Sequence, residues 1–557
     1  MTDTIKVHCL NTDEYKEVKI GSSLKELIDI FGVKKPFLIG NAKVNNKTES
    51  LSYKVYRPIR VEYFDISDQS AMRTYVRSLC FLLAKAVDDI MPKSQVYFEH
   101  AISKGYYFYI KNGHSVTKDD LQNIKARMRE IVDADIPFLQ IEEEKDEVVK
   151  LFHQNNMEDK ALLIETSDDL LYARYSKLDN YIDYYYGCLL PSTGYIKLYD
   201  VVEYNGGYLL IIPNRQNPVE LEPVIMQPML LQVYREHLEF LNISNLKNAG
   251  DLNRAIRNNK ISEIVQVSEA YQANEISDIA KDITHRYKNN GARLVLISGP
   301  SSSGKTTFRK RLEVQLFVNR LKPIGLSLDD YFVNREDSPT DENGEKDYES
   351  LYAIDLDLFK DHLNKLLNGE EIDVPSYNFV TGKREYKGNK IKMHDRSVLI
   401  VEGIHALNPE LTENIARNRK FMAYISALTS ISLDNHNWIP ASDNRLLRRM
   451  VRDYKYRGYS AEETISRWDS VRRGEDKWIF PYQENADVML SSAMIYELAA
   501  IRRHAEPILR RVPRTAPEYS EAHRLLKFLG YFNYLTDKEL PPTSLLREFL
   551  GGSSFRY

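Results

Sequence analysis

Cysteine, long apolar runs and net charge are all scarce in this 557-residue chain. Its three cysteines, Cys9, Cys80 and Cys188, are scattered without metal-ligand spacing, so we expect reduced thiols in a cytoplasmic protein. No run of about 18 apolar residues occurs, so the sequence predicts neither a transmembrane helix nor a membrane partner. The first residues lack the layout of a signal peptide. A net charge of −4 gives no overall attraction to nucleic acid.

The chain is too long for one hydrophobic core, and we expect several domains. Hydrophobic residues make up 43% and charged residues 28%, which is ordinary for a folded soluble protein. The pattern predicts a multidomain α/β protein. We expect a small β-rich module at 1–64, an α+β module at 65–220, a helical connector at 221–288, a parallel sheet flanked by helices at 289–500 and a helical tail at 501–557.

The segment Gly299–Thr306 has the phosphate-binding pattern GxxxxGK[ST]. It follows a short apolar run, 293–298, and precedes a stretch without Gly or Pro, as a loop between a buried strand and a helix should. Such a loop places phosphates at a helix N-terminus, and a turn that binds nothing is the alternative. The expected nucleotide-binding residues are Gly299, Ser301, Ser302, Ser303, Gly304, Lys305, Thr306 and Thr307.

Two carboxylates follow later strand-like runs. Asp329 comes after 324–328, where an acid can accept the proton of an attacking hydroxyl, and a turn-forming Asp pair is the alternative. Glu402 comes after 397–401, where it can organise Mg²⁺ together with Thr306, and a helix-capping acid is the alternative. Beyond them lies a basic helical stretch, either a solvated face or a set of groups that stabilise phosphoryl charge. Its candidate residues are Arg448, Arg449 and Arg452.

These features, in this order, resemble the uridine kinase branch of small-molecule P-loop kinases over residues 290–500. The segment 326–332 resembles the one that carries the family's catalytic Asp, here Asp329, and Lys305 of the phosphate loop is a second catalytic candidate. The resemblance implies ATP or GTP with Mg²⁺ as cofactors, and it implies that the three arginines belong to a mobile lid. The substrate-binding residues that we expect are Glu349, Tyr377, Phe379, Arg384 and Arg467, with Tyr377 on the base of a nucleoside.

The sequence departs from the family pattern where the base is recognised. Gly382 replaces the expected His, Tyr459 replaces the expected lid Arg, and the position of a usual Gln falls at Ser466 or Arg467. A polar segment, 434–438, lengthens the chain before the basic helix. The acceptor therefore stays open between a nucleoside, uridine or cytidine first, and a more anionic molecule, as in the related phosphoribulokinases.

The N-terminal half resembles two modules of threonyl-tRNA synthetases, the TGS module at 1–64 and the editing-type module at 68–212. The reactive positions of the editing module align with Arg77, Phe81, Tyr185 and Leu189. None of these side chains can build a His/Cys metal or hydrolytic site, so we expect no editing activity. A scaffold, a regulatory domain and an RNA-contacting platform all stay open.

The leading hypothesis is an NTP-dependent kinase that phosphorylates a hydroxyl of a nucleoside or a similar small molecule. The alternative from another class is an RNA-associated regulator that uses nucleotide binding as a switch. The nearly neutral net charge and the acceptor-side motifs count against that alternative. A homo-oligomer stays open.

Overall fold

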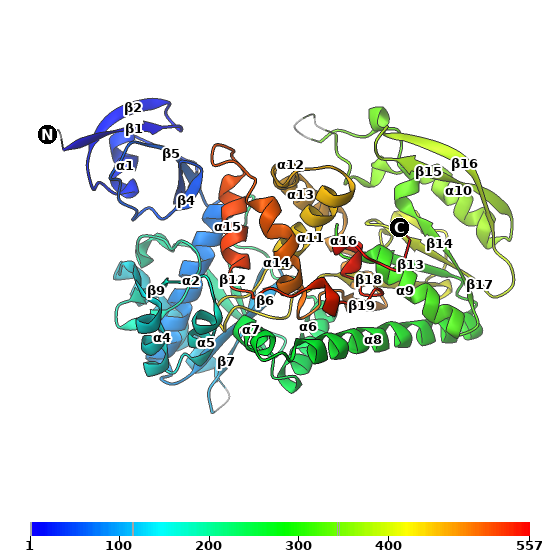
Figure 1. Ribbon diagram of the computed structural model, residues 1–557, viewed down its shortest axis with the longest axis horizontal. Coiled ribbons are helices and arrows are strands. Elements are labelled where there is room, and N and C mark those ends of the chain that lie inside the picture. The colour runs from blue at the N-terminus through cyan, green and yellow to red at the C-terminus, as the bar shows by residue number, and fades with distance from the viewer. Residues whose placement is uncertain (1–2, 114–115, 342–343, 345, 557) are drawn as a thin grey trace.

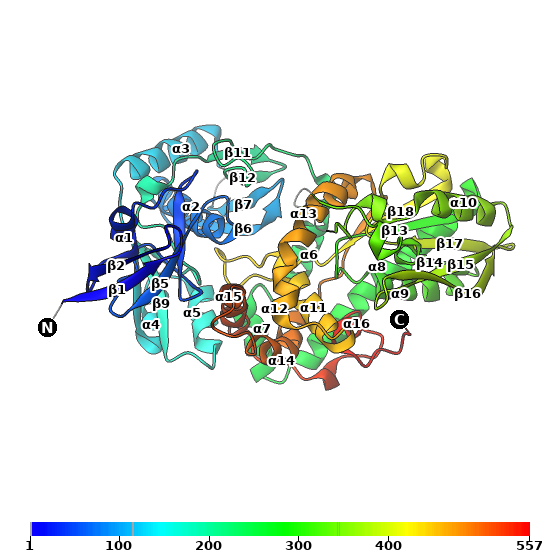
Figure 2. The same ribbon diagram turned by 90° about the horizontal axis from the view of Figure 1, so that it is seen from above.

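The computed structural model describes residues 3–113, 116–341, 344 and 346–556. Its elements form two halves with the C-terminal segment between them, as Figures 1 and 2 show. The helix α8 (Ile261–Asn290) runs along one side of the molecule toward the C-terminal half. Among the described residues, no helix combines the length and the apolar character needed to cross a membrane.

The first module is a five-stranded sheet with one helix. The strands have the order β2-β1-β5-β3-β4, and the core face of the sheet packs on α1. A capping box between Ser23 and Glu26 begins that helix, and Gly32 in the left-handed region ends it. The bounds are β1 (Thr4–Cys9), β2 (Glu14–Lys19), α1 (Leu24–Phe31), β3 (Ile39–Val44), β4 (Lys47–Glu49) and β5 (Ile59–Asp65).

The second module has two antiparallel sheets around the long helix α2 (Gln69–Ile90), which Asp68 caps. One sheet has the order β11-β12-β7-β6, and the other has the order β10-β9-β8. Their strands are β6 (Gln95–Ile102), β7 (Gly105–Lys111), β8 (Phe138–Glu144), β9 (Tyr172–Leu178), β10 (Tyr181–Asp183), β11 (Asp200–Tyr204) and β12 (Gly207–Ile211). The remaining helices are α3 (Lys118–Asp133), α4 (Lys145–Gln154) and α5 (Glu158–Thr166).

Two helices, α6 (Pro228–Ile243) and α7 (Ala249–Arg257), precede α8, and the C-terminal half then folds around a parallel sheet. The sheet order is β14-β17-β13-β18-β19, and every pair in it is parallel. The central strands are apolar and buried along their length, as strands covered on both faces must be. The predicted parallel sheet is thus confirmed. Its strands are β13 (Leu294–Ser298), β14 (Lys322–Ser327), β17 (Ser397–Glu402), β18 (Lys420–Ser426) and β19 (Val488–Ser491).

Helices and a two-stranded hairpin surround the parallel sheet. The hairpin is β15 (Glu371–Asn378) with β16 (Lys383–Lys392). One face of the sheet packs on α8 and α9 (Lys305–Val318), and the other packs on α6 and α10 (Leu356–Leu367). The helices α11 (Ala441–Tyr456), α12 (Ala461–Ser466) and α13 (Trp468–Trp478) pack instead with the C-terminal helices.

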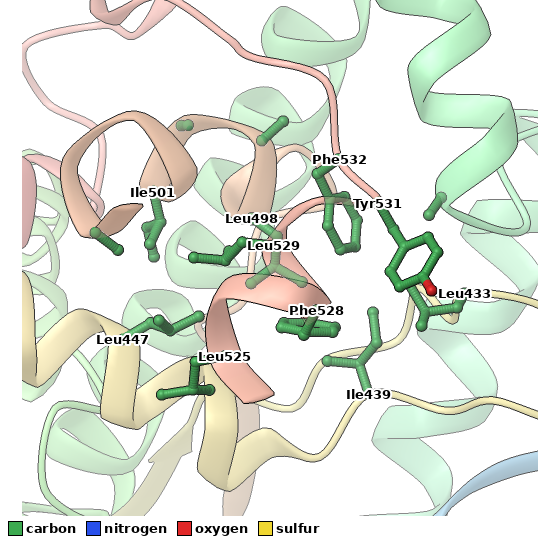
Figure 3. Packing of buried hydrophobic residues seen from close by; sticks show 14 of the residues in the cluster. Leu433, Ile439, Leu447, Leu498, Ile501, Leu525, Phe528, Leu529, Tyr531 and Phe532 are labelled. Atoms are coloured by element: carbon green, nitrogen blue, oxygen red, sulfur yellow. The ribbon is translucent and has the colours of Figure 1, made fainter. Parts of the chain in front are cut away.

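The C-terminal segment packs between the halves and is less helical than expected. It forms α14 (Glu497–Leu509), α15 (Tyr519–Leu529) and α16 (Arg547–Leu550), with Pro541 and Pro542 in the non-helical stretch between the last two. Figure 3 shows Leu525 and Phe528 of α15 packed with Leu447 of α11 and with Ile439. This hydrophobic cluster also contains residues of α4 and α5, so it is one core shared by the front half, α11 and the tail.

The polar segment that lengthens the chain before α11 is an anchor between the halves. Lys160 of α5 is fully buried and contacts the carboxylates of Asp183 and Asp434 at 3.3 and 3.2 Å. His436 Nδ1 pairs with Asp183 at 2.6 Å, and Asn437 donates to the Tyr184 carbonyl at 2.8 Å. The insertion therefore fastens the kinase-like half to the editing-like module through buried, mutually paired charges.

Candidate active site

The predicted phosphate loop joins β13 to α9, as the strand–loop–helix pattern requires. A side chain on Gly299 would lie 1.9 Å from the Ile425 carbonyl of β18, so the close approach of two strands demands glycine here. The Lys305 ammonium donates to the carbonyls of Gly299 and Pro300 at 3.0 and 3.1 Å. The loop thus curls around its own lysine at the N-terminus of α9, where a phosphate is stabilised.

Two buried hydroxyls of the loop have no hydrogen-bond partner among the described residues. They belong to Ser302 and Ser303. Ser302 holds a left-handed backbone at φ 58°, and Gly304 follows at φ 85°. A concave loop with unpartnered buried hydroxyls matches the oxygens of a nucleotide phosphate. The residues present therefore fit the predicted nucleotide.

Thr306 and Glu402 meet as the sequence predicts for a magnesium site. The Thr306 hydroxyl donates to the two Glu402 carboxylate oxygens at 3.0 and 3.3 Å. Glu402 is buried at the end of β17, and burial raises its pKa, an effect that Arg309 and Lys305 oppose. No group of three or more His, Cys, Asp or Glu suited to a metal occurs in the described ranges. A hydroxyl and one carboxylate still fit Mg²⁺, which takes its other ligands from phosphates and water.

The charges of several carboxylates act on Lys305. Burial lowers the pKa of Lys305, and the charges of Glu402, Asp329, Glu548 and Glu349 oppose that shift. Asp329 is exposed in a 3₁₀ turn, Leu328–Tyr331, directly after β14. The structure thus brings the predicted proton acceptor and the predicted metal-site acid to the same lysine, although they lie 73 positions apart.

Glu349 lies close to the loop and has a strongly altered proton affinity. Burial raises its pKa to about 7, with Glu475 and Asp329 adding repulsion and Arg449 and Lys305 opposing it. A side chain on Gly474 of α13 would lie 2.3 Å from the Glu349 Cβ, so this glycine makes room for the glutamate. A carboxylate close to the phosphate loop with a pKa near 7 is suited to contact the hydroxyl acceptor.

Three aromatic rings form a cluster beside Asp330. The Tyr377 ring lies 5.5 Å from Phe332 and 5.1 Å from Phe379, between ring centroids. The Tyr377 backbone N–H donates to Asp330 at 3.4 Å, which ties the hairpin to the turn that carries the catalytic candidate. The Phe379 side chain is half exposed, so the cluster offers an open aromatic face.

One buried carboxylate, Asp453, holds three arginines. Its oxygens lie 3.4 Å from Arg449 Nε, 2.9 Å from Arg452 Nε and 3.5 Å from an Arg457 terminal nitrogen. Arg449 also donates to the Ser301 hydroxyl at 2.9 Å, and Arg457 lies 5.5 Å above the Phe379 ring. The group carries more positive than negative charge, and it joins the loop to the aromatic cluster.

The structure places Arg448 differently from Arg449 and Arg452. Arg448 is fully buried in a two-pronged ion pair with Glu497 of α14, and it also donates to Ser492. Arg445 forms a similar buried pair with Glu475, and its guanidinium donates to the Ser301 carbonyl at 3.1 Å. Through these contacts the two buried arginines hold the loop in place. Arg448 therefore has the contacts of a structural residue and not those of a mobile lid arginine.

The remaining substrate-side candidates are tied to neighbours. Arg384 pairs with Asp355 at 2.7 Å, and Arg467 is exposed and lies 4.8 Å above the Tyr459 ring. Gly382 adopts φ 71° in the hairpin turn, and a side chain there would lie 2.8 Å from Arg335. The departure at Gly382 therefore has a local cause, because the turn packs closely on Arg335.

Glu548 of α16 is a site residue that no sequence pattern predicted. Its carboxylate accepts from the Thr307 backbone N–H at 3.2 Å and from the Thr307 hydroxyl at 2.5 Å. Leu545 packs on Gly304, where an added side chain would lie 2.5 Å from it. No local pattern marks Glu548, since it reaches the loop from more than 240 positions away and only the tertiary fold brings it there.

The positions that align with the editing module's reactive residues lie in the front half. Arg77, Tyr185 and Leu189 line a cavity, while Phe81 is buried against Phe138 and Tyr185. Arg77 donates to the Cys188 carbonyl at 3.0 Å. The expectation that these positions carry no hydrolytic chemistry stays a prediction.

Comparison with known sequences identifies relatives of both halves. The profile of the phosphoribulokinase / uridine kinase family matches residues 294–498. The uridine kinase of Staphylococcus aureus (strain JH9) is 30% identical over 198 residues, 35% of this chain and 86% of that protein. The uridine kinase of Anoxybacillus flavithermus is 29% identical over 195 residues, 35% of this chain and 83% of that protein.

The N-terminal region is similar to the threonine–tRNA ligase of Syntrophomonas wolfei, at 30% identity over 168 residues. The match covers 30% of this chain and only 26% of the ligase. The solved structure of a possible uridine kinase from Bacillus stearothermophilus is 18% identical and covers 36% of this chain and 88% of its own, with a TM-score of 0.22. Because that TM-score is low, the assignment rests on the sequence comparisons. The chain belongs to the phosphoribulokinase / uridine kinase family, and its kinase region is fused to an N-terminal region similar to a threonine–tRNA ligase.

Proposed function

We propose that the protein transfers the γ-phosphoryl group of ATP or GTP to a hydroxyl of a nucleoside, with uridine and cytidine as the first candidates. The observation that carries this proposal is that the charges of Asp329, Glu349 and Glu402 all act on Lys305, while Glu402 also accepts from the Thr306 hydroxyl at 3.0 Å. A phosphate loop alone would serve a nucleotide switch equally well. Carboxylates on the acceptor side are needed only when a hydroxyl must be held and deprotonated.

In this proposal each side chain has one task. Lys305 and the loop N–H groups bind the phosphates, and Thr306 with Glu402 would hold Mg²⁺, which supplies charge neutralisation when bound. Asp329 accepts the proton of the acceptor hydroxyl, and its exposure at the strand end leaves it open to a substrate. Glu349 orients the acceptor, and Tyr377 with Phe379 offers aromatic faces for a base.

The arginines on Asp453 complete the proposed site. Arg449 and Arg452 lie on α11, and Arg457 lies on the loop after it. Arg457 lies two residues before Tyr459, the position where the family pattern has its lid arginine, so we assign it the role that Tyr459 cannot fill. These guanidinium groups stabilise charge on the transferring phosphoryl group, and Arg448 holds the loop from behind.

The same arginine group favours a second candidate acceptor, a small molecule that already carries a phosphate. Three guanidinium groups share one carboxylate, so positive charge is left over beside the acceptor side. An anionic acceptor would neutralise that charge better than a nucleoside does.

Phosphoryl transfer with purified full-length protein tests the proposal. ATP or GTP with Mg²⁺ is offered with uridine, cytidine, adenosine, guanosine and ribose 5-phosphate, and products are identified by mass spectrometry. We expect a nucleoside monophosphate that forms only when the acceptor is present. A product from ribose 5-phosphate alone would favour the second candidate. Consumption of no acceptor, together with tight and salt-sensitive RNA binding, would favour the nucleotide switch instead.

A further inference from the structure

The front half contains a cavity that is separate from the kinase site. Its volume is about 750 Å³, within the range of roughly 300–1,000 Å³ that small-molecule sites occupy. Its walls come from β4, the first half of α2, β8 and β9, the segment 184–191 and α15. No residue of the phosphate loop or of the parallel sheet lines it. It therefore lies where the first module, the second module and the tail meet.

The cavity is lined by more cations than anions. Six Lys or Arg side chains and three Glu side chains face it. Four of the cations are paired: Lys47 with Glu49, Arg174 with Glu142, and Arg73 and Arg524 with Glu521. The other two are Arg77 and Lys527.

Arg77 and Lys527 have no carboxylate partner among the residues that the structure describes. Arg77 donates only to neutral acceptors, the Cys188 carbonyl at 3.0 Å and the Thr74 hydroxyl at 3.5 Å. Lys527 makes neither a hydrogen bond nor an ion pair within the described ranges, and its side chain is accessible from the cavity. Arg77 is half-buried and Lys527 is exposed, so both cations are accessible to an anion that enters the cavity.

The surroundings of Lys527 show the same excess of positive charge. Burial lowers its pKa to about 8, and repulsion by Arg174, Lys47 and Arg77 adds to the shift. Burial also lowers the pKa of Arg77. An anion placed between these groups would reverse both shifts, because opposite charge favours the protonated forms.

Aromatic side chains also line the cavity and could contact the uncharged base of a nucleotide-sized ligand. Tyr184, Tyr185, Tyr186 and Tyr531 line the cavity, and the hydroxyls of Tyr184 and Tyr531 hydrogen-bond to each other. Tyr184, Tyr185 and Tyr531 are almost fully buried and Tyr186 is half-buried, so Tyr186 is the ring placed to contact a base. The cavity thus combines cations for a phosphate with aromatic surface for an uncharged ring.

We propose that this cavity binds a phosphate-bearing small molecule of nucleotide size, with Arg77 and Lys527 on its phosphate. The site uses none of the proposed kinase residues, so it can be tested with the kinase site disabled.

The test uses full-length protein with Lys305→Met, which removes the phosphate-loop lysine. Isothermal titration calorimetry at pH 7 and low salt measures binding of UMP, AMP and inorganic phosphate. We expect a nucleotide to bind this variant, and phosphate to compete with it. Adding Arg77→Met and Lys527→Met weakens binding at least about tenfold, the loss of a charge-assisted hydrogen bond. Lys35→Met, at an exposed lysine outside the cavity, leaves binding unchanged.

Two results would overturn the proposal. One is that none of the three probes binds the Lys305→Met protein. The other is that the triple variant, shown by its melting curve to be folded, binds as tightly as the Lys305→Met parent. Should the triple variant fail to fold, Lys527→Gln alone replaces it, and undiminished binding by that variant counts equally against the site. Tight binding of a 5′-phosphorylated RNA oligonucleotide without binding of any mononucleotide would also contradict a small-molecule site.

Discussion

Glu548 accepts hydrogen bonds from the backbone N–H and the hydroxyl of Thr307 at 3.2 and 2.5 Å. Thr307 is the second residue after the loop lysine, so its N–H lies in the first turn of α9, where phosphate oxygens bind in such loops. A carboxylate of the tail therefore occupies a donor that a nucleotide would use. Binding of a nucleotide must displace Glu548 or leave this donor unused.

We expect Glu548→Gln to tighten ATP binding by roughly tenfold, because an amide holds the Thr307 donors less strongly and adds no negative charge beside Lys305. Calorimetric titration with Mg·ATP measures the change. Glu370→Gln, at an exposed carboxylate of the same domain, serves as the control and leaves the affinity unchanged. Equal or weaker binding by Glu548→Gln would show that the tail carboxylate does not compete with nucleotide.

The Glu349 carboxyl makes stability depend on pH. Its pKa is raised from 4.5 to about 7 in the folded protein, so its charged form is disfavoured by folding. This contribution is neutral below pH 4.5, where the group is protonated in both states, and it becomes destabilising as pH rises to 7. The free energy of unfolding of Glu349→Gln, measured with urea, should therefore exceed that of the wild type at pH 8 by at most about 3 kcal/mol. At pH 4 the two proteins should be equally stable. Glu336→Gln, an exposed control, should show no such trend.

Substitutions of Arg448 and Arg452 should have different effects, one on stability and the other on turnover. Arg448→Met leaves Glu497 buried without its partner, so we expect a loss of about 3–5 kcal/mol in the free energy of unfolding. Arg452 is half buried at the surface of α11, so Arg452→Met should lower kcat with little change in stability. Urea unfolding and steady-state kinetics on both variants measure the two effects. If Arg448→Met is instead folded and stable but has low turnover, the result would favour the prediction that Arg448 belongs to the mobile lid.

Lys527 should make nucleotide binding in the front cavity depend on pH. The groups that act on it are the cations Arg174, Lys47 and Arg77 and the Cys188 thiol, whose pKa is raised by burial. His523 also lines the cavity, and burial and then the charges of Lys47 and Lys527 lower its pKa. A bound phosphate favours protonated Lys527, so affinity for UMP should be full below pH 8 and fall as pH rises through 8. Titrations of Lys305→Met protein between pH 7 and 9.5 measure this. Adding Lys527→Arg should make the UMP affinity independent of pH over this range. If the affinity of the Lys305→Met protein is already independent of pH, Lys527 does not bind the phosphate.

The parts of the site that follow strands were predictable from the sequence. Asp329 and Glu402 each follow an apolar run, and parallel strands end at one edge of their sheet, so their meeting at Lys305 needed no tertiary information. The strand–loop–helix unit around Gly299–Thr306 was equally predictable, because its pattern is local.

Contacts between distant segments were not predictable. Glu548 and Asp453 have no local signature, since one lies in a short tail helix and the other is a single acid in a basic stretch. The basic stretch predicted several equivalent arginines, whereas packing against α14 buries Arg448 and leaves Arg452 at the surface. Only the three-dimensional arrangement distinguishes arginines that hold the loop from those that face a substrate.

The most direct test of the account is the pair of measurements on Asp329→Asn. Asn retains the shape of the side chain but cannot accept the proton of the acceptor hydroxyl. Mg·ATP affinity should stay within about twofold of wild type, while kcat with the accepted nucleoside falls by a factor on the order of 10²–10⁴. Wild-type turnover in this variant would contradict the proposed catalytic role of Asp329.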